Sequence, residues 1–231
     1  MRHDGHVDIG RVLVLRELLA SSGWIERTQS FARTMHRSTK DPGGLLLVGT
    51  PDVEPWHLAA HLDDEARISG VAELSPTLIR YAPPVDAPPH LSFPLQRLEQ
   101  AKRSKTVFVV SEEDVPSSLL ERAWDARKTG ATVLSLDAGD SELQQVAHES
   151  LTIVRNEVQP VRYEVSQLVD STPSPATGSV ENADTVTFDT MQHLVSVAAG
   201  EVAMSPSQRS IKQRLAHLLE TISGPRSESG R

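Results

Sequence analysis

The chain has 231 residues and a formal net charge of −8, and hydrophobic residues make up 38% of it. This length suits one large α/β domain or two small ones. The acidic balance argues against nucleic acid and anionic membranes as partners, because both bind basic surfaces. The densest basic stretch, Lys102-Arg103-Lys105, is interpreted as a solvated helix end.

Cysteine is absent from the chain. Its absence excludes disulfides and thiolate chemistry, and it fits a cytoplasmic location. No apolar run approaches the roughly 20 residues that span a bilayer. The N-terminus lacks the long apolar segment of a secretory signal.

Residues 1–42 are predicted to form an N-terminal helical segment. A helical pattern runs from Asp8 to about Thr39 and is interrupted near Ser21-Ser22-Gly23. Two helices or one kinked helix are therefore expected before the first strand.

Residues 43–203 alternate between strand and helix patterns. Short apolar runs predict strands at 45–48, 77–81, 106–110, 132–136 and 151–154. Helical patterns lie between them, at about 55–68, 91–102, 116–130 and 141–148. This alternation predicts an α/β fold, a three-layer, doubly wound parallel sheet of about five strands with helices on both faces.

After residue 154 the alternation stops. Residues 171–184 are rich in Ser, Thr and Pro and predict a flexible loop. A helix is expected again at 186–203. Residues 204–231 are expected to hold an amphipathic C-terminal helix at 211–222 and a disordered polar tail.

This order of elements resembles a sugar isomerase (SIS) domain, in particular the phosphoheptose isomerase branch, over roughly Gly43 to Ala203. Residues 49–61 stand where that branch has a Gly- and Ser-rich turn and then a helix with a histidine and a glutamate. Residues 106–128 stand where it has a strand, a phosphate loop and a helix, and residues 132–154 match the elements that follow. The resemblance implies a flavodoxin-like sheet, a homodimer or homotetramer, and a ligand similar to a sugar phosphate.

The two loops of this resemblance differ from the family pattern. The first reads Gly49-Thr50-Pro51-Asp52-Val53-Glu54, and the second reads Ser111-Glu112-Glu113-Asp114-Val115-Pro116-Ser117-Ser118. A phosphate needs free N–H groups and hydroxyl donors at a helix N-terminus. A carboxylate at roughly 5 Å opposes each phosphate charge by about 3 kcal/mol. The candidate ligand-binding residues are Thr50, Ser111, Ser117 and Ser118.

A possible metal site comes from histidines at helical spacing. His57 and His61 share one helix face, as do Asp189 and His193 on the C-terminal helix. Phosphoheptose isomerases carry a comparable histidine and carboxylate on the first of these helices, although His61 replaces the carboxylate here. The resemblance thus implies a divalent metal such as zinc on His57, His61, Asp189 and His193, with Glu65 in reserve. The alternative is that these are exposed or hydrogen-bonded histidines on two amphipathic helices.

Other patterns leave the function open. The acidic run 112–114 could bind a cation or simply be a solvated loop before a helix. Trp56 and Trp124 could stack on a ligand or pack in the core or an interface. The loop motifs of α/β-hydrolases, dinucleotide-binding proteins and P-loop nucleotide-binding proteins are missing, and no catalytic residue is assigned. Three functions remain: a diverged SIS-like protein that binds a carbohydrate derivative, a non-enzymatic assembly or regulatory protein, and a metal-dependent sugar-phosphate isomerase.

Overall fold

The computed structural model describes residues 23–81, 83, 93–153 and 188–204. The predicted first part of the N-terminal helical segment lies outside the described residues. So do most of the Pro-rich loop before residue 93, the loop predicted at 171–184 and the helix predicted at 211–222.

A five-stranded sheet forms the centre of the molecule. Its strands follow one another in space in the order β2-β1-β3-β4-β5, and all neighbours are parallel. This is the flavodoxin-like order, in which the connections change direction between β1 and β3. The predicted doubly wound α/β fold is therefore confirmed. The strands are β1 (Leu45–Val48), β2 (Thr77–Ile79), β3 (Thr106–Ser111), β4 (Thr132–Asp137) and β5 (Glu149–Thr152).

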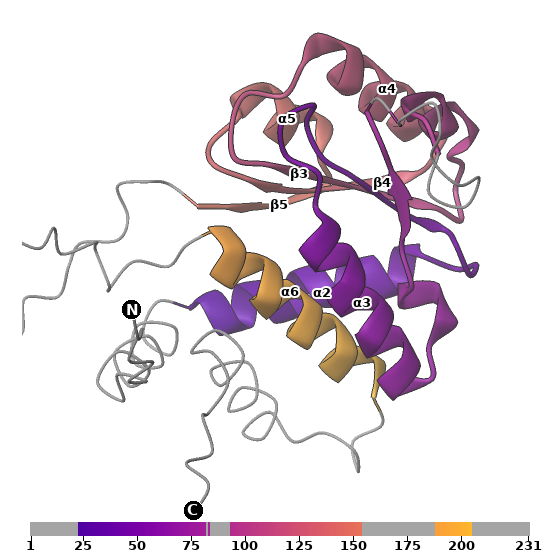
Figure 1. The fold of residues 1–231 in the computed structure, drawn as a ribbon, viewed down its shortest axis with the longest axis vertical. Helices are drawn as coiled ribbons and strands as arrows, with labels where there is room; N and C mark the ends of the chain where they lie inside the picture. The colour runs from indigo at the N-terminus through magenta and orange to yellow at the C-terminus, as the bar shows by residue number, and fades with distance from the viewer. Residues whose placement is uncertain (1–22, 82, 84–92, 154–187, 205–231) are drawn as a thin grey trace, which may run out of the picture.

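Helices cover both faces of this sheet, as Figure 1 shows. On one face lie α2 (Trp24–Ser38), α3 (Trp56–Ser69) and α6 (Phe188–Ala203), with α6 packed against both of the others. On the opposite face lie η3 (Leu95–Gln100), α4 (Ser117–Lys128) and α5 (Ser141–Val146). Every residue of β1 and β3 is buried, because both faces of these strands are covered.

Alternate side chains of each strand serve the two halves of the core. Leu45 and Leu47 of β1 pack on the α2–α3–α6 side, whereas Leu46 and Val48 pack on the α4–α5 side. Phe108 of β3 contacts Phe31 of α2 with ring centroids 5.2 Å apart. None of the helices in the described ranges is both long and apolar enough to cross a membrane.

The main differences from the sequence predictions concern three elements. β5 begins two residues earlier than the predicted 151–154, because its polar residues Glu149 and Ser150 pair with β4 at the edge of the sheet. The helix predicted at 91–102 is a 3-10 helix at Leu95–Gln100, and it starts directly after Pro94. β2 ends at Ile79, and Arg80 forms only an isolated parallel bridge with Pro94.

Candidate functional site

Ligands of doubly wound sheets bind beyond the carboxyl ends of the strands, where the strand order reverses. In this chain the reversal lies between β1 and β3. Two connections flank it. The first loop, residues 49–55, joins β1 to α3, and the second loop, residues 112–116, joins β3 to α4.

The first loop is closed by its own backbone. The N–H of Thr50 donates to the carbonyl of Val53 at 3.1 Å, and the Thr50 hydroxyl accepts the N–H of Val53 at 3.3 Å. A Cβ at Gly49 would lie 2.0 Å from the Val53 carbonyl oxygen, so only glycine fits this close approach. The predicted ligand residue Thr50 is thus buried and bonded within its own loop.

Trp56, Glu54 and Arg80 form a connected cluster beside this loop. The indole Nε1–H of Trp56 donates to a Glu54 oxygen at 2.7 Å, and the Arg80 Nε–H donates to both Glu54 oxygens at 3.0 Å. The Arg80 guanidinium carbon lies 5.2 Å from the centroid of the Trp56 ring. The ion pair is largely buried, whereas Trp56 is 41% exposed. We call these three residues the Trp56 platform.

The second loop also uses its hydroxyl internally. Ser111 is fully buried, and its hydroxyl donates to the carbonyl of Glu113 and accepts the N–H of the same residue. The N–H of Val115 donates to Asp140 Oδ2 at 2.7 Å, which ties this loop to the start of α5. Ser111 is therefore a turn-forming residue in this arrangement.

Ser117 and Ser118 open α4 and have different surroundings. Ser117 is exposed, and its side chain makes no hydrogen bond to another described residue. The Ser118 hydroxyl pairs with the hydroxyl of Tyr81. Because Arg80 binds the first loop and Tyr81 binds α4, the two residues after β2 connect both sides of the reversal point.

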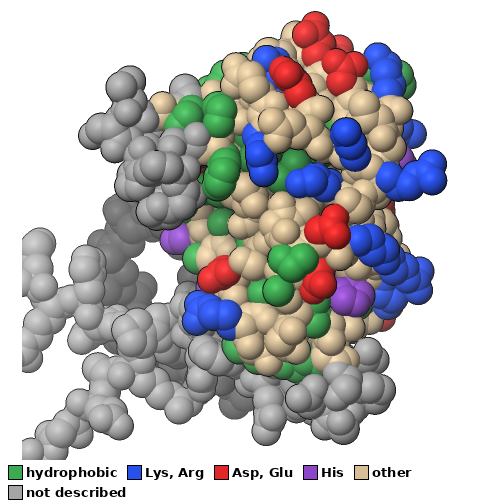
Figure 2. All heavy atoms as spheres, turned by 90° about the vertical axis from the view of Figure 1, so that its right-hand side faces the viewer, with side chains coloured by type: hydrophobic (Ala, Val, Ile, Leu, Met, Phe, Trp, Pro, Cys, Tyr) green, Lys and Arg blue, Asp and Glu red, His purple; other side chains and the backbone are tan. Residues whose placement is uncertain are grey.

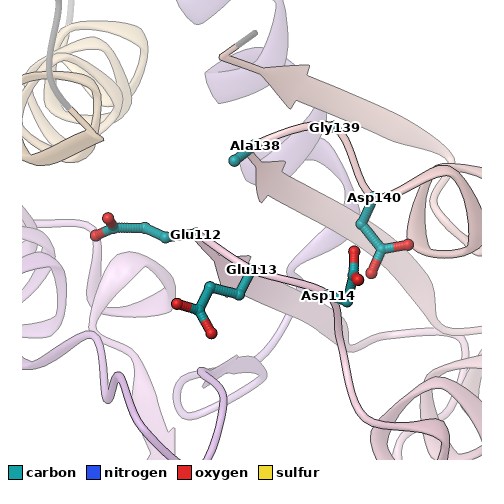
Figure 3. A pocket seen from close by; sticks show the side chains of 6 residues that line it. All are labelled: Glu112, Glu113, Asp114, Ala138, Gly139 and Asp140. Atoms are coloured by element: carbon teal, nitrogen blue, oxygen red, sulfur yellow. The ribbon is translucent and has the colours of Figure 1, made fainter. Parts of the chain in front are cut away.

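An open depression of about 530 Å³ lies next to the second loop, between the carboxyl ends of β3 and β4. Figure 3 shows that Glu112 and Glu113 extend away from Asp140. Asp140 itself is satisfied, because its Oδ1 caps α5 through the N–H groups of Glu142 and Leu143. The depression is lined by Glu112, Glu113, Asp114, Ala138, Gly139 and Asp140. Four carboxylates line it and no cation does so among the described residues, so it disfavours anionic ligands.

The four predicted metal ligands do come together, where α3 packs on α6. His57 Nδ1 lies 3.8 Å from one Asp189 oxygen, and His193 Nε2 lies 3.5 Å from the other. His61 meets the ring of His193 edge-on, with centroids 4.3 Å apart. We call these four residues the histidine cluster. Glu65, the reserve ligand, lies on the same helix α3, one turn after His61.

Burial disfavours the protonated form of two of these histidines. It lowers the pKa of His61, and the neighbouring His193 and His57 lower it further. Burial also lowers the pKa of His193, although Asp189 opposes this effect. Among the described residues, no group of three or more His, Asp or Glu side chains is arranged to hold a metal ion. The cluster as placed consists of two His–Asp contacts and one ring contact where α3 packs on α6.

Sequence reasoning missed Arg80 and Tyr81, which it placed within a strand. The available signal was an arginine and a tyrosine directly after an apolar run, at the edge where ligands bind. It also missed the capping role of Asp140, although an Asp directly before a helical pattern is a common N-cap.

Comparisons with known proteins show similarity at the level of overall structure only. No family model matches this chain, and no curated protein matches it. A solved structure of a candidate phosphosugar isomerase from Salmonella typhimurium LT2 matches with a TM-score of 0.43 and 13% identity, over 80% of this chain and 45% of the other. A candidate sugar-binding protein from the same organism matches with a TM-score of 0.49 and 14% identity, over 92% and 53%. The chain spans about half the length of each.

Proposed function

We propose that this chain binds a carbohydrate derivative at the Trp56 platform and catalyses no reaction there. The observation that carries the proposal is an exposed indole held rigid at the carboxyl edge of the sheet. Trp56 is fixed by its bond to Glu54, and Glu54 is fixed in turn by Arg80. Aromatic rings with a polar partner at their rim are a common way to bind ligands that have one apolar face and one polar edge.

A sugar ring has these two properties, because its C–H groups form an apolar face and its hydroxyls form a polar rim. The free part of the Trp56 ring offers the apolar contact. Glu54 and Arg80 offer the polar one: a carboxylate has about four acceptor positions, and Arg80 Nη1 makes no hydrogen bond to another described residue. The platform can therefore accept and donate hydrogen bonds beside a stacked ring.

The carboxyl edge favours an uncharged sugar over a phosphorylated one. The hydroxyls of Thr50 and Ser111 are used within their own loops, and Ser118 is paired with Tyr81. The three carboxylates of the second loop have no cationic partner within the described residues. A phosphate at the start of α4 would therefore be repelled by the carboxylates of the second loop and would find few free hydrogen-bond donors.

The test is a binding screen with unphosphorylated sugars, sugar phosphates and nucleotide sugars, read by thermal shift and by tryptophan fluorescence. We expect saturable binding of at least one unphosphorylated sugar and weaker binding of its phosphate. Trp56→Ala should abolish it. Trp124→Ala is the matched control, because Trp124 is 44% exposed on α4, away from the platform. A flat response to every compound, or equal loss in both variants, would refute the proposal.

A second candidate, metal binding by the histidine cluster, is favoured by its two His–Asp contacts of 3.5 and 3.8 Å. Two ligands of one tetrahedral zinc lie ~3.3 Å apart, given bonds of about 2.0–2.1 Å. Each pair is close to this spacing, but the two histidines contact different oxygens of Asp189. Three ligands on one metal therefore require His57, which is highly exposed, or His61 to turn. Metal analysis of protein purified without chelator, with His193→Gln as the control, tests this candidate. Protein that contains no metal and shows no binding of added zinc in calorimetry would exclude metal binding by the histidine cluster.

A further inference from the structure

The two edges of the sheet carry opposite charges. The loops that lead into β1 and β3 hold four cations and one carboxylate, Asp41, and so carry a net positive charge. We call the four cations the basic edge: Lys40, Lys102, Arg103 and Lys105. The second loop, at the opposite end of β3, holds three carboxylates, and we call these the acidic edge: Glu112, Glu113 and Asp114. Because all strands are parallel, each set lies at one edge.

Backbone hydrogen bonds fix the basic edge in place. The N–H of Lys40 donates to the carbonyl of Ser104 at 3.1 Å, which joins the two basic loops. The N–H of Thr132 donates to the carbonyl of Lys105 at 3.0 Å, which anchors them to β4. In the part of the chain that the structure describes, none of the four cations forms an ion pair. Their charge is therefore available to a partner.

The face in Figure 2 looks toward the side of Figure 1 from which the strands start. A band of Lys and Arg side chains crosses the upper half of this face, and the apolar side chains form only small, separate patches. Contact through this face would therefore be electrostatic rather than hydrophobic.

The two edges are far enough apart to act separately. β3 joins Lys105 to Glu112, and its six residues span roughly 20 Å. This exceeds the screening length of about 8 Å at physiological salt. The placement of some carboxylates at the carboxyl ends of the strands is explained by the helices that begin there, because carboxylates favour helix N-termini. Asp140 serves α5 in this way. Glu112 and Glu113 lie several residues before α4. Lys102, Arg103 and Lys105 follow only a short 3-10 helix, whereas Lys40 follows the end of α2.

We propose that copies of this chain associate head to tail, with the basic edge of one copy docked on the acidic edge of the next. Charge complementarity within the one sequence carries this inference, because each copy presents both halves of the contact. Such a contact is heterologous, so each copy keeps one free edge and species larger than a dimer form. The inference does not depend on carbohydrate binding at the Trp56 platform.

Sedimentation velocity of the full chain tests the head-to-tail association at two salt concentrations, about 20 mM and about 500 mM NaCl. At the higher concentration the screening length falls below about 5 Å. We expect concentration-dependent association at low salt and monomers at high salt. The double variant Lys102→Glu, Arg103→Glu should remain monomeric at low salt, and so should Glu112→Lys, Glu113→Lys. A mixture of the two variants should associate, because one offers only acidic edges and the other only basic ones.

Arg33→Glu is the matched control, since Arg33 is exposed on α2 and the charge change per residue is the same. It should associate like the unmodified chain, and circular dichroism should show all variants folded. A monomeric chain at low salt overturns the inference, as does a mixture of the double variants that fails to associate. A monomer that instead binds a labelled oligonucleotide through Lys102 and Arg103 overturns it in favour of nucleic acid.

Discussion

The first and second loops leave neighbouring strands at the same edge of the sheet, yet their carboxylates differ in whether they have an ion-pair partner. In the first loop, Glu54 is paired with Arg80 and holds Trp56. In the second loop, Glu112, Glu113 and Asp114 have no such partner within the described residues. Paired charge holds the exposed Trp56 ring in place, whereas unpaired charge repels anions and attracts cations. The same strand-loop-helix unit thus supports two kinds of surface.

Both loops close on themselves, and Gly49→Ala tests how strongly the first depends on that closure. A Cβ there would lie 2.0 Å from the Val53 carbonyl oxygen and 2.7 Å from Pro55. We expect the free energy of unfolding to fall by about 3 kcal/mol, because the loop must open. Urea denaturation measures the change. Gly70→Ala is the control, because Gly70 also has a positive φ of 72° but no atom lies within 4 Å of the new Cβ. Its expected loss is only the backbone cost of about 1 kcal/mol. Equal losses would contradict the closure argument.

The second loop depends on a distant carboxylate instead. Asp140 accepts N–H groups from Val115, Glu142 and Leu143. Asp140→Ala should lower the free energy of unfolding by about 2 kcal/mol, because it removes a helix cap and leaves the buried N–H of Val115 without a partner. Thermal or urea denaturation measures this loss. Asp114→Ala should change stability by less than about 0.5 kcal/mol, and a comparable loss there would show that Asp140 is not special.

Acid should weaken the histidine cluster before it affects either loop. Burial lowers the folded-state pKa of His61 and His193 below the ordinary histidine value of 6.5, so the unfolded chain binds protons more readily. Stability from these histidines is present above about pH 6.5 and falls as the pH drops through this range toward the folded-state pKa values. The melting temperature should decrease between about pH 7.5 and pH 5.5. His61→Gln with His193→Gln should flatten this dependence. An unchanged slope would place the titrating groups elsewhere, for example at His148, whose pKa is also lowered by burial.

The smallest effect is expected from the unpaired charges of the second loop. Glu112→Gln with Glu113→Gln should change the free energy of unfolding by less than about 0.5 kcal/mol, because Glu113 is exposed, Glu112 is partly exposed, and neither forms an ion pair with another described residue. Urea denaturation at low salt is the measurement. A loss above about 1 kcal/mol would mean that these carboxylates stabilise the fold after all.

Most of the sheet could be predicted from the sequence because β1, β3 and β4 are short apolar runs between turn residues. β5 was placed two residues late because an edge strand needs fewer apolar residues, and its start is set by pairing with β4. The meeting of His57 and His61 with Asp189 followed from helical spacing and the resemblance. The Trp56 platform could not be predicted, because the bond from Arg80 to Glu54 joins residues 26 positions apart and depends on the turn of the chain after β2.

The position of α6 has a consequence for how the protein is made. All buried side chains of the core on the α4–α5 face come from residues 46–146, so this half can assemble early in synthesis. The other half needs Met191, Leu194 and Val195 of α6. At about 5–20 residues per second, the ribosome takes on the order of several seconds to advance from Ile153 to Ala203. During that interval the nascent chain presents uncovered apolar side chains of α2 and α3, which is when a chaperone would be most useful to it.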